Sequence, residues 1–221
     1  MRSLSVASCL VLLSLGLSSC GDDEEPAAGG GETVECDYPA AGQAAREVDA
    51  PPTEADASGE IPATITLAGG EVPITLDAEG APCTVNSFTS LAEQGYFDDS
   101  ACHRLTTQGI FVLQCGDPTE DEALRGTGGP GYSFADETDP SDTYERGTLA
   151  MANAGPDTNG SQFFMVYDES PLPPDYTVFG SISEDGLAVL DAIAEEGAQG
   201  GAPDGPPAAA EDATIESVTV D

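Results

Sequence analysis

The chain contains no lysine, no tryptophan, a single histidine and only five arginines, against 41 aspartate and glutamate residues. Its formal net charge of −36 gives a surface that repels nucleic acid and anionic lipid head groups, so neither is expected as a general partner. A zinc site is not expected either, because no Cys-x-x-Cys pair exists to join the lone His103. The sequence therefore predicts no metal and no other cofactor.

The first twenty residues have the pattern of an export signal. Arg2 gives a positive start, and residues 4–17 form an apolar run without acids. That run of about fourteen residues is shorter than the ~20 that span a hydrocarbon core, so a membrane-spanning helix is not predicted. The ending Leu17-Ser18-Ser19-Cys20 resembles the lipobox of bacterial lipoproteins, which implies cleavage after residue 19 and a lipid on Cys20. The protein is then extracytoplasmic and anchored to the cell membrane by lipid alone, and an ordinary cleaved signal is the alternative.

Two regions of different composition follow. Residues 20–59 are rich in acids, Ala, Gly and Pro and hold almost no large apolar side chains, which predicts an unstructured tether in which only residues 36–39 are expected to dock on the domain. From residue 60 the chain shows short alternating apolar runs, which predicts a folded domain over 60–221. We expect that domain to act as a monomer.

The alternating runs predict a mainly β domain. Residues 64–67 and 72–76 flank Gly69-Gly70 as a hairpin would. Helical spacing is present in residues 84–94, with Thr84 as the cap, and in residues 187–194. Further strands are expected over 109–114, 147–152, 163–167, 177–183 and 214–220. Many short strands with two helices indicate a closed antiparallel barrel with helices capping its ends.

Two other motifs do not predict a functional site, because the residues around them do not fit. The glycine-rich residues 126–131 match G-x-G-x-x-G, but an acidic segment precedes them and no helix follows, so a dinucleotide site is not predicted. No serine or cysteine elbow accompanies His103, so nucleophilic catalysis is not predicted either.

Five stretches, taken together and in this order, resemble the cyclophilin family of peptidyl-prolyl isomerases. They are Cys-His-Arg at 102–104, Phe-Val-Leu-Gln-Cys-Gly-Asp-Pro at 111–118, Gly-Thr-Gly-Gly at 126–129, the block at 151–164 and Val-Phe-Gly at 178–180. The fourteen-residue block is far more specific than any single short motif. The resemblance implies an eight-stranded closed barrel capped by two helices, and an enzyme that rotates X-Pro bonds in exported proteins.

The resemblance also implies roles for individual residues. Arg104 corresponds to the family's catalytic arginine, and Phe111 and Gln114 complete the catalytic set. The substrate-binding residues that it implies are Val112, Ala152, Asn153, Gln162, Phe164, Leu172 and Tyr176. Two departures are present: two extra residues lie between Arg104 and Phe111, and no tryptophan stands where cyclosporin-sensitive members carry one.

Strand alternation separates two neighbouring aromatic residues. Phe163 is expected in the core, and Phe164, one step along the same strand, on the opposite face towards the groove. A groove of this kind would bind proline-containing segments. A chaperone or scaffold that holds such segments with little turnover is the alternative function.

Four cysteines remain beyond the expected anchor, namely Cys36, Cys83, Cys102 and Cys115. An even number in an oxidising compartment predicts disulfides, and four cysteines allow three connectivities. We predict Cys83–Cys102, because that bond would join the first helix to the strand carrying Arg104. Cys36 and Cys115 would then pair or stay free.

Overall fold

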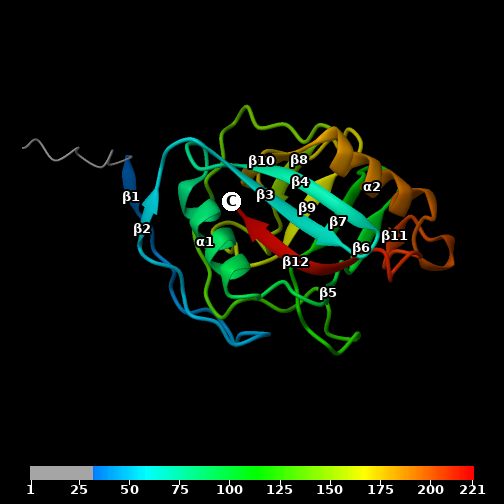
Figure 1. Cartoon of the computed structure of the whole chain (residues 1–221), viewed down its shortest axis with the longest axis horizontal. Coiled ribbons are helices and arrows are strands. Elements are labelled where there is room, and N and C mark those ends of the chain that lie inside the picture. Colours follow the sequence, from blue (N-terminus) through cyan, green and yellow to red (C-terminus); the bar gives the residue numbers. More distant parts are fainter. Residues whose placement is uncertain (1–31) are drawn as a thin grey trace, which may run out of the picture. The chain divides into compact units, whose positions relative to one another are not determined.

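The computed structural model describes residues 32–221 (Figure 1). The signal peptide expected over residues 1–19, the expected lipidation residue Cys20 and the start of the expected tether lie outside the described residues. In chain order the elements are β1 (Thr33–Glu35), β2 (Glu54–Asp56), β3 (Glu60–Leu67), β4 (Gly70–Asp77), α1 (Pro82–Glu93), β5 (Ser100–Ala101), β6 (Arg104–Thr106), β7 (Val112–Cys115), β8 (Thr148–Met151), β9 (Phe163–Val166), β10 (Val178–Ile182), α2 (Glu184–Glu195), the 3-10 helix η1 (Gln199–Gly201), β11 (Asp204–Gly205) and β12 (Thr214–Val220).

Ten strands form one curled antiparallel sheet in the order β11-β6-β7-β9-β8-β10-β4-β3-β12-β5, with α1 and α2 towards opposite ends of it (Figure 1). The prediction of a mainly β fold with two α-helices is confirmed. The prediction of a closed eight-stranded barrel is wrong, because the described sheet has ten strands and no pairing joins its end strands β11 and β5. Alternating apolar runs reveal strands, but closure depends on the stagger between them, which those runs do not encode.

The chain itself crosses the side of the sheet that pairing leaves open. Cys102 N donates to Ala213 O, directly before β12, at 2.8 Å, and His103 N donates to Gln114 O of β7 at 3.0 Å. Two consecutive residues between β5 and β6 therefore bond to strands near opposite ends of the pairing order.

An apolar core fills the inside of the curled sheet. Inward positions alternate along the β3–β4 hairpin, whose prediction is confirmed, and the buried residues are Ala63, Ile65, Leu67, Val72, Ile74 and Leu76. Phe88 of α1 meets the rings of Phe97, Phe163 and Phe179 at centroid distances of 5.2, 5.5 and 5.3 Å. Aromatic pairs at such distances contribute about 0.5–1.5 kcal/mol each beyond their buried area. These contacts fix α1 against the sheet.

Both helices begin before the positions that the sequence predicts. The N-cap of α1 is Ala81 and not Thr84, and no side chain of its own caps it. The carboxylate of Glu137 instead accepts hydrogen bonds from the N–H groups of Cys83 and Thr84 at 2.9 and 2.8 Å. A distant acid thus binds the free N–H groups of the first turn. Ser183 caps α2, and no helix of residues 32–221 has the length and apolarity to cross a membrane.

The described part of the expected tether is folded against the domain. Arg46 donates through Nη1 to three carbonyl oxygens beyond the end of α1, those of Gly95, Tyr96 and Asp98, at 2.9, 2.9 and 2.6 Å. Ala41 N donates to Gly131 O at 2.9 Å, and β1 pairs with β2. Polar and covalent contacts order this segment. Amino-acid composition could not predict this order, because composition indicates only how much apolar surface a segment can bury.

Residues 32–221 contain two disulfides, Cys36–Cys83 and Cys102–Cys115. The predicted Cys83–Cys102 bond is wrong. The antiparallel pairing of β6 with β7 brings Cys115 beside Cys102, and the ordered segment before β2 brings Cys36 to α1. One bond therefore joins the strand pair that carries Arg104, and the other fastens the N-terminal segment.

Replacing Cys36 and Cys83 together by serine should lower the free energy of unfolding, because their disulfide has a sequence separation of 47 residues. Chain-entropy estimates for such a loop give about 4 kcal/mol. Chemical denaturation measures this loss, and hydrogen exchange should accelerate in residues 33–57. The Cys102→Ser/Cys115→Ser pair, with a separation of 13, should lose about 3 kcal/mol and leave exchange in residues 33–57 slow. Unchanged exchange in the first variant would show that the disulfide does not hold this segment.

Candidate active site

One transverse row of the sheet builds the site. Arg104 of β6 lies opposite Gln114 of β7, which lies opposite Phe164 of β9, and the row continues through Ala150 of β8 to Val178 of β10. Residues directly opposite one another in a sheet point to the same face. The row therefore places a cation, an amide and an aromatic ring side by side on the outer face.

Alternation along β7 divides its side chains between two faces. Val112 belongs to a small apolar cluster on the outer face, with Ile110 packed against it, whereas Leu113 belongs to the main core. Phe111 packs against the main core and meets the ring of Tyr167 at 6.0 Å. Phe111 therefore lies away from the outer face, whereas Ile110, two positions before Val112, lines the pocket on that face.

The outer face carries a pocket of about 200 Å³, which we call the groove. Its lining residues are Arg104, Ile110, Val112, Gln114, Ala152, Asn153, Phe164, Leu172 and Tyr176. Apart from Phe111 and Gln162, every predicted catalytic and binding residue lies on this wall. Phe163 and Phe164 lie in the main core and in the outer cluster respectively, as alternation predicts.

Tyr144, which the sequence did not single out, supports the groove from behind. Its hydroxyl donates to Tyr176 O at 2.8 Å and accepts from Tyr176 N at 3.0 Å. The ring of Phe164 lies 6.0 Å from that of Tyr144 and 5.6 Å from that of Tyr176. Burial raises the pKa of Tyr144 to about 12, so its hydroxyl stays protonated and keeps donating. Tyr144 therefore fixes the loop that supplies Tyr176.

The guanidinium of Arg104 is held from two sides. Its Nε donates to Oδ1 of Asp204 at 2.8 Å and its Nη2 to Oδ2 at 2.7 Å, while Nη1 donates to Oε1 of Gln114 at 3.3 Å. The hydrogen bonds to Asp204 raise the pKa of Arg104, and the same bonds lower the pKa of Asp204. Sequence offered no signal for Asp204, which lies 100 positions from Arg104 among 41 acids.

A line of hydrogen bonds continues beyond Arg104. Gln114 Nε2 donates to Gln162 Oε1 at 2.9 Å, and Gln162 Nε2 donates to Gly128 O at 2.9 Å. Gln162 therefore acts behind Gln114 and does not line the groove. Asp117 holds the glycine loop, because its carboxylate accepts from the N–H groups of Gly126 and Gly128 at 2.7 and 2.8 Å.

The Asp117 carboxylate stays ionised although the residue is buried. Burial by itself raises the pKa of Asp117, but the hydrogen bonds from Thr119 and the two glycines outweigh burial, and the pKa lies below its ordinary value. Arg125 closes the same loop by donating from Nε to Thr119 O at 3.2 Å.

A second recess of about 640 Å³ adjoins the groove and shares Gln114, Ala152 and Asn153 with it. Its other walls include the glycine loop over residues 126–130, residues 41–43 of the N-terminal segment, and residues 160–162, so the predicted binding residue Gln162 lines this recess. The two hollows together can accept an extended chain, with one side group in the groove and its neighbours along the recess.

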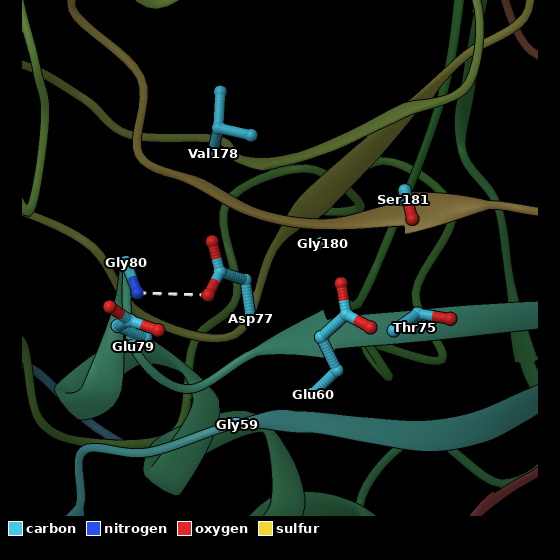
Figure 2. A pocket seen from close by; sticks show the side chains of 9 residues that line it. All are labelled: Gly59, Glu60, Thr75, Asp77, Glu79, Gly80, Val178, Gly180 and Ser181. Carbon is cyan, nitrogen blue, oxygen red and sulfur yellow. Dashed lines mark hydrogen bonds between the residues drawn. The ribbon is translucent and has the colours of Figure 1, made fainter.

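A separate acidic hollow of about 720 Å³ lies where β3, β4 and β10 meet (Figure 2). Three carboxylates, those of Glu60, Asp77 and Glu79, line it. Asp77 Oδ1 accepts from Gly80 N at 2.9 Å. Its lining has no cationic side chain and only one apolar side chain, Val178, so we do not assign the site to it.

The groove is suited to a neutral, largely apolar group with one polar atom near Arg104. Within residues 32–221, no set of three or more His, Cys, Asp or Glu side chains is placed to hold a metal ion. His103 lies beside Gly126, outside the groove lining, and burial lowers its pKa.

A family model described as "Cyclophilin type peptidyl-prolyl cis-trans isomerase/CLD" matches residues 63–220. The chain belongs to this family of enzymes. Among curated relatives, the probable peptidyl-prolyl cis-trans isomerase B of Mycobacterium leprae is 50% identical over 206 residues, which cover 85% of this chain and 67% of that protein. The protein of the same name from Mycobacterium tuberculosis is 57% identical over 155 residues, which cover 64% of this chain but only 48% of the relative.

Solved structures show the same fold. The cyclophilin type peptidyl-prolyl cis-trans isomerase of Cryptosporidium parvum, determined in the presence of the dipeptide Ala-Pro, superposes with a TM-score of 0.60 at 28% identity. The match covers 72% of this chain and 98% of that one. A second structure of the C. parvum protein gives a TM-score of 0.59 at 26% identity, covering 74% and 98%.

Replacing Gly116, directly after β7, by alanine should destabilise the fold. Gly116 has a φ of +90°, and a Cβ there would lie 2.2 Å from Ser161 O. We expect a loss of about 2 kcal/mol or more from backbone strain alone. Gly129→Ala is the matched control, because a Cβ at Gly129 meets nothing within 4 Å. Thermal unfolding measures both, and equal melting temperatures would contradict the close approach at Gly116.

Proposed function

We propose that this chain accelerates the cis-trans rotation of X-Pro bonds in exported proteins, with the proline held in the groove and Arg104 as the hydrogen-bond donor. The observation that carries the proposal is a guanidinium held in place on the wall of a small pocket that also has apolar side chains. Membership of the isomerase family and the Ala-Pro dipeptide present with the C. parvum relative agree with it.

The energy that this reaction demands is modest. Amide resonance gives the bond a barrier of about 18–20 kcal/mol, with uncatalysed exchange in tens to hundreds of seconds. Reaching about 10 turnovers per second requires roughly a thousandfold acceleration, or ~4 kcal/mol. One well-placed donor in a dry site contributes about 3–4 kcal/mol. A single arginine is therefore sufficient in principle.

Arg104 keeps free donors for this task. A guanidinium has five N–H groups, and three of them are used, two by Asp204 and one by Gln114. One N–H on each terminal nitrogen remains for the substrate. Donation to the twisting prolyl unit, at its carbonyl oxygen or its nitrogen, stabilises the state in which resonance is lost.

The size and lining of the groove favour a proline ring. Its volume of about 200 Å³ lies below the roughly 300–1,000 Å³ of sites for drug-sized ligands, so it accepts one small group. Val112, Phe164 and Leu172 supply apolar walls that exclude water from the ring. Asn153 lies where the groove meets the second recess and is placed to contact the peptide backbone.

Turnover is favoured over simple holding of proline segments. A chaperone groove needs apolar walls, but it gains nothing from a guanidinium fixed by a bidentate acid. The bonds that hold Arg104 at 2.7–2.8 Å orient a donor, which catalysis of rotation requires and passive binding does not.

We further propose that the protein works outside the cytoplasm, anchored to the cell membrane through a lipid on Cys20, and acts as a monomer. Two disulfides in the described chain agree with an oxidising compartment. The net charge of −36 opposes association between copies.

Arg104→Ala should reduce kcat/KM on a proline peptide by about 100- to 1,000-fold, the loss typical of one essential donor. The melting temperature should change little, because Arg104 is only partly buried. Exchange spectroscopy or a protease-coupled peptide assay measures the rate. Arg146→Ala is the matched control, because Arg146 makes the same kind of ion pair, with Asp191, away from the groove. Wild-type rates in Arg104→Ala would overturn the assigned donor, and peptide binding without turnover in the wild type would favour the chaperone alternative.

Cys20→Ser should leave the protein either unprocessed or released into the medium, because serine offers no sulfur for lipid attachment. Cys9→Ser is the control, since Cys9 lies within the expected signal and should leave processing unchanged. Membrane fractionation and intact mass spectrometry measure both. A processed, membrane-bound Cys20→Ser protein would contradict the lipid anchor.

A further inference from the structure

A short edge strand brings Asp204 to the groove. Asp204 of β11 lies opposite Thr106 of β6, two positions along the strand from Arg104. Thr107 N donates to Pro203 O at 2.9 Å, and Gln199 N donates to Pro206 O at 2.8 Å. Backbone bonds therefore fix the loop that presents Asp204, and they do not depend on its side chain.

We propose that Asp204 is a positioning residue: its carboxylate fixes the guanidinium of Arg104 at the groove wall. The inference rests on the proposed function, because it concerns the donor of that reaction. Asp204 does not line the groove and needs no contact with substrate.

The geometry of the pair supports a positioning role. Two parallel bonds, from Nε and Nη2 to the two carboxylate oxygens, fix both the location and the plane of a guanidinium. Gln114 alone, at 3.3 Å from a single nitrogen, leaves that plane free to turn. Arg104 has a long flexible side chain whose exposed fraction is 38%, so packing does not hold it.

The choice of atoms keeps the donor available. Asp204 binds Nε and one N–H of Nη2, on the side of the guanidinium away from Gln114. The remaining N–H groups belong to Nη1 and Nη2, the terminal nitrogens. By binding Nε–H and one N–H of Nη2, the carboxylate orients the two N–H groups that remain free. It also partly neutralises the charge of Arg104.

The kinetic test compares Asp204→Ala, Asp204→Asn and Asp191→Ala. We expect Asp204→Ala to lower kcat about tenfold with KM within twofold, because a loosened donor weakens transition-state contacts more than binding. Asp204→Asn keeps one acceptor oxygen and should recover part of the loss. Asp191→Ala breaks the equally bidentate pair with Arg146 and should leave both constants unchanged. Unchanged kcat in Asp204→Ala would overturn the proposal.

The double variant Arg104→Ala/Asp204→Ala tests whether Asp204 acts through Arg104. It should be no slower than Arg104→Ala alone, because residues that act through one group are not additive. A further tenfold loss would overturn the proposal by showing an independent role of Asp204.

A spectroscopic test observes the guanidinium itself. Residues 32–221 contain four arginines, so their Nε–H signals are few enough to assign by single substitutions. The Arg104 Nε–H should exchange slowly with water in the wild type and in Asp191→Ala, and rapidly in Asp204→Ala. Equal exchange in Asp204→Ala would overturn the proposal. A wild type without turnover but with a slowly exchanging Arg104 Nε–H would reject the proposed function while leaving the fixed guanidinium intact.

Discussion

The register between β6, β7, β9 and β8 is the constraint on which the groove depends. It aligns Arg104, Gln114, Phe164 and Ala150 across four strands. A slip of one residue in any pairing would turn that strand's outer side chains into the core. The Cys102–Cys115 bond and the close contact of Gly116 with residue 161 both lie at the end of β7, where they oppose such a slip.

A chain of polar contacts builds on this register. It passes from Asp204 through Arg104, Gln114 and Gln162 to the glycine loop that Asp117 holds. Each side chain in this chain of hydrogen bonds orients the next one. The same hydrogen bonds therefore hold both Arg104 and the glycine loop that lines the second recess. The apolar walls of the groove lie on the same face and need no polar partner of their own.

Much of this site was predictable from sequence, and the predictions that missed had physical causes. Alternation placed Phe163 and Phe164 on opposite faces, and the family resemblance selected Arg104 and Gln114. The resemblance also selected Phe111, but in the structure Ile110, two positions before the start of β7, lines the groove and Phe111 packs against the core. Asp204 could not be found, since the contact that makes it important joins residues 100 positions apart.

The global features show the same limits. The sequence did not predict ten strands, because the two-residue strands β5 and β11 carry no alternating pattern. It did not predict the open pairing order either, because that order depends on the stagger between strands. The N-terminal segment, apart from residues 36–39, was taken as unstructured because it lacks apolar side chains, yet Arg46 also binds it to the domain. The expected docking of residues 36–39 agrees with the disulfide of Cys36. Composition indicates the hydrophobic contribution to folding, but it does not show whether a few polar or covalent bonds hold a segment in place.

The way in which arginine is used has a consequence for proteolysis. With no lysine in the chain, a trypsin-like protease can cut residues 32–221 only after Arg46, Arg104, Arg125 and Arg146. Each of these side chains is already bound, to backbone carbonyls or to a carboxylate of the protein itself. Cleavage would require local opening at the same contacts that support the fold. The contacts of Arg46, Arg104 and Arg146 reach distant parts of the fold, whereas Arg125 bonds only within its own loop and its neighbours 121–124 are exposed, so Arg125 is the site most open to such proteases.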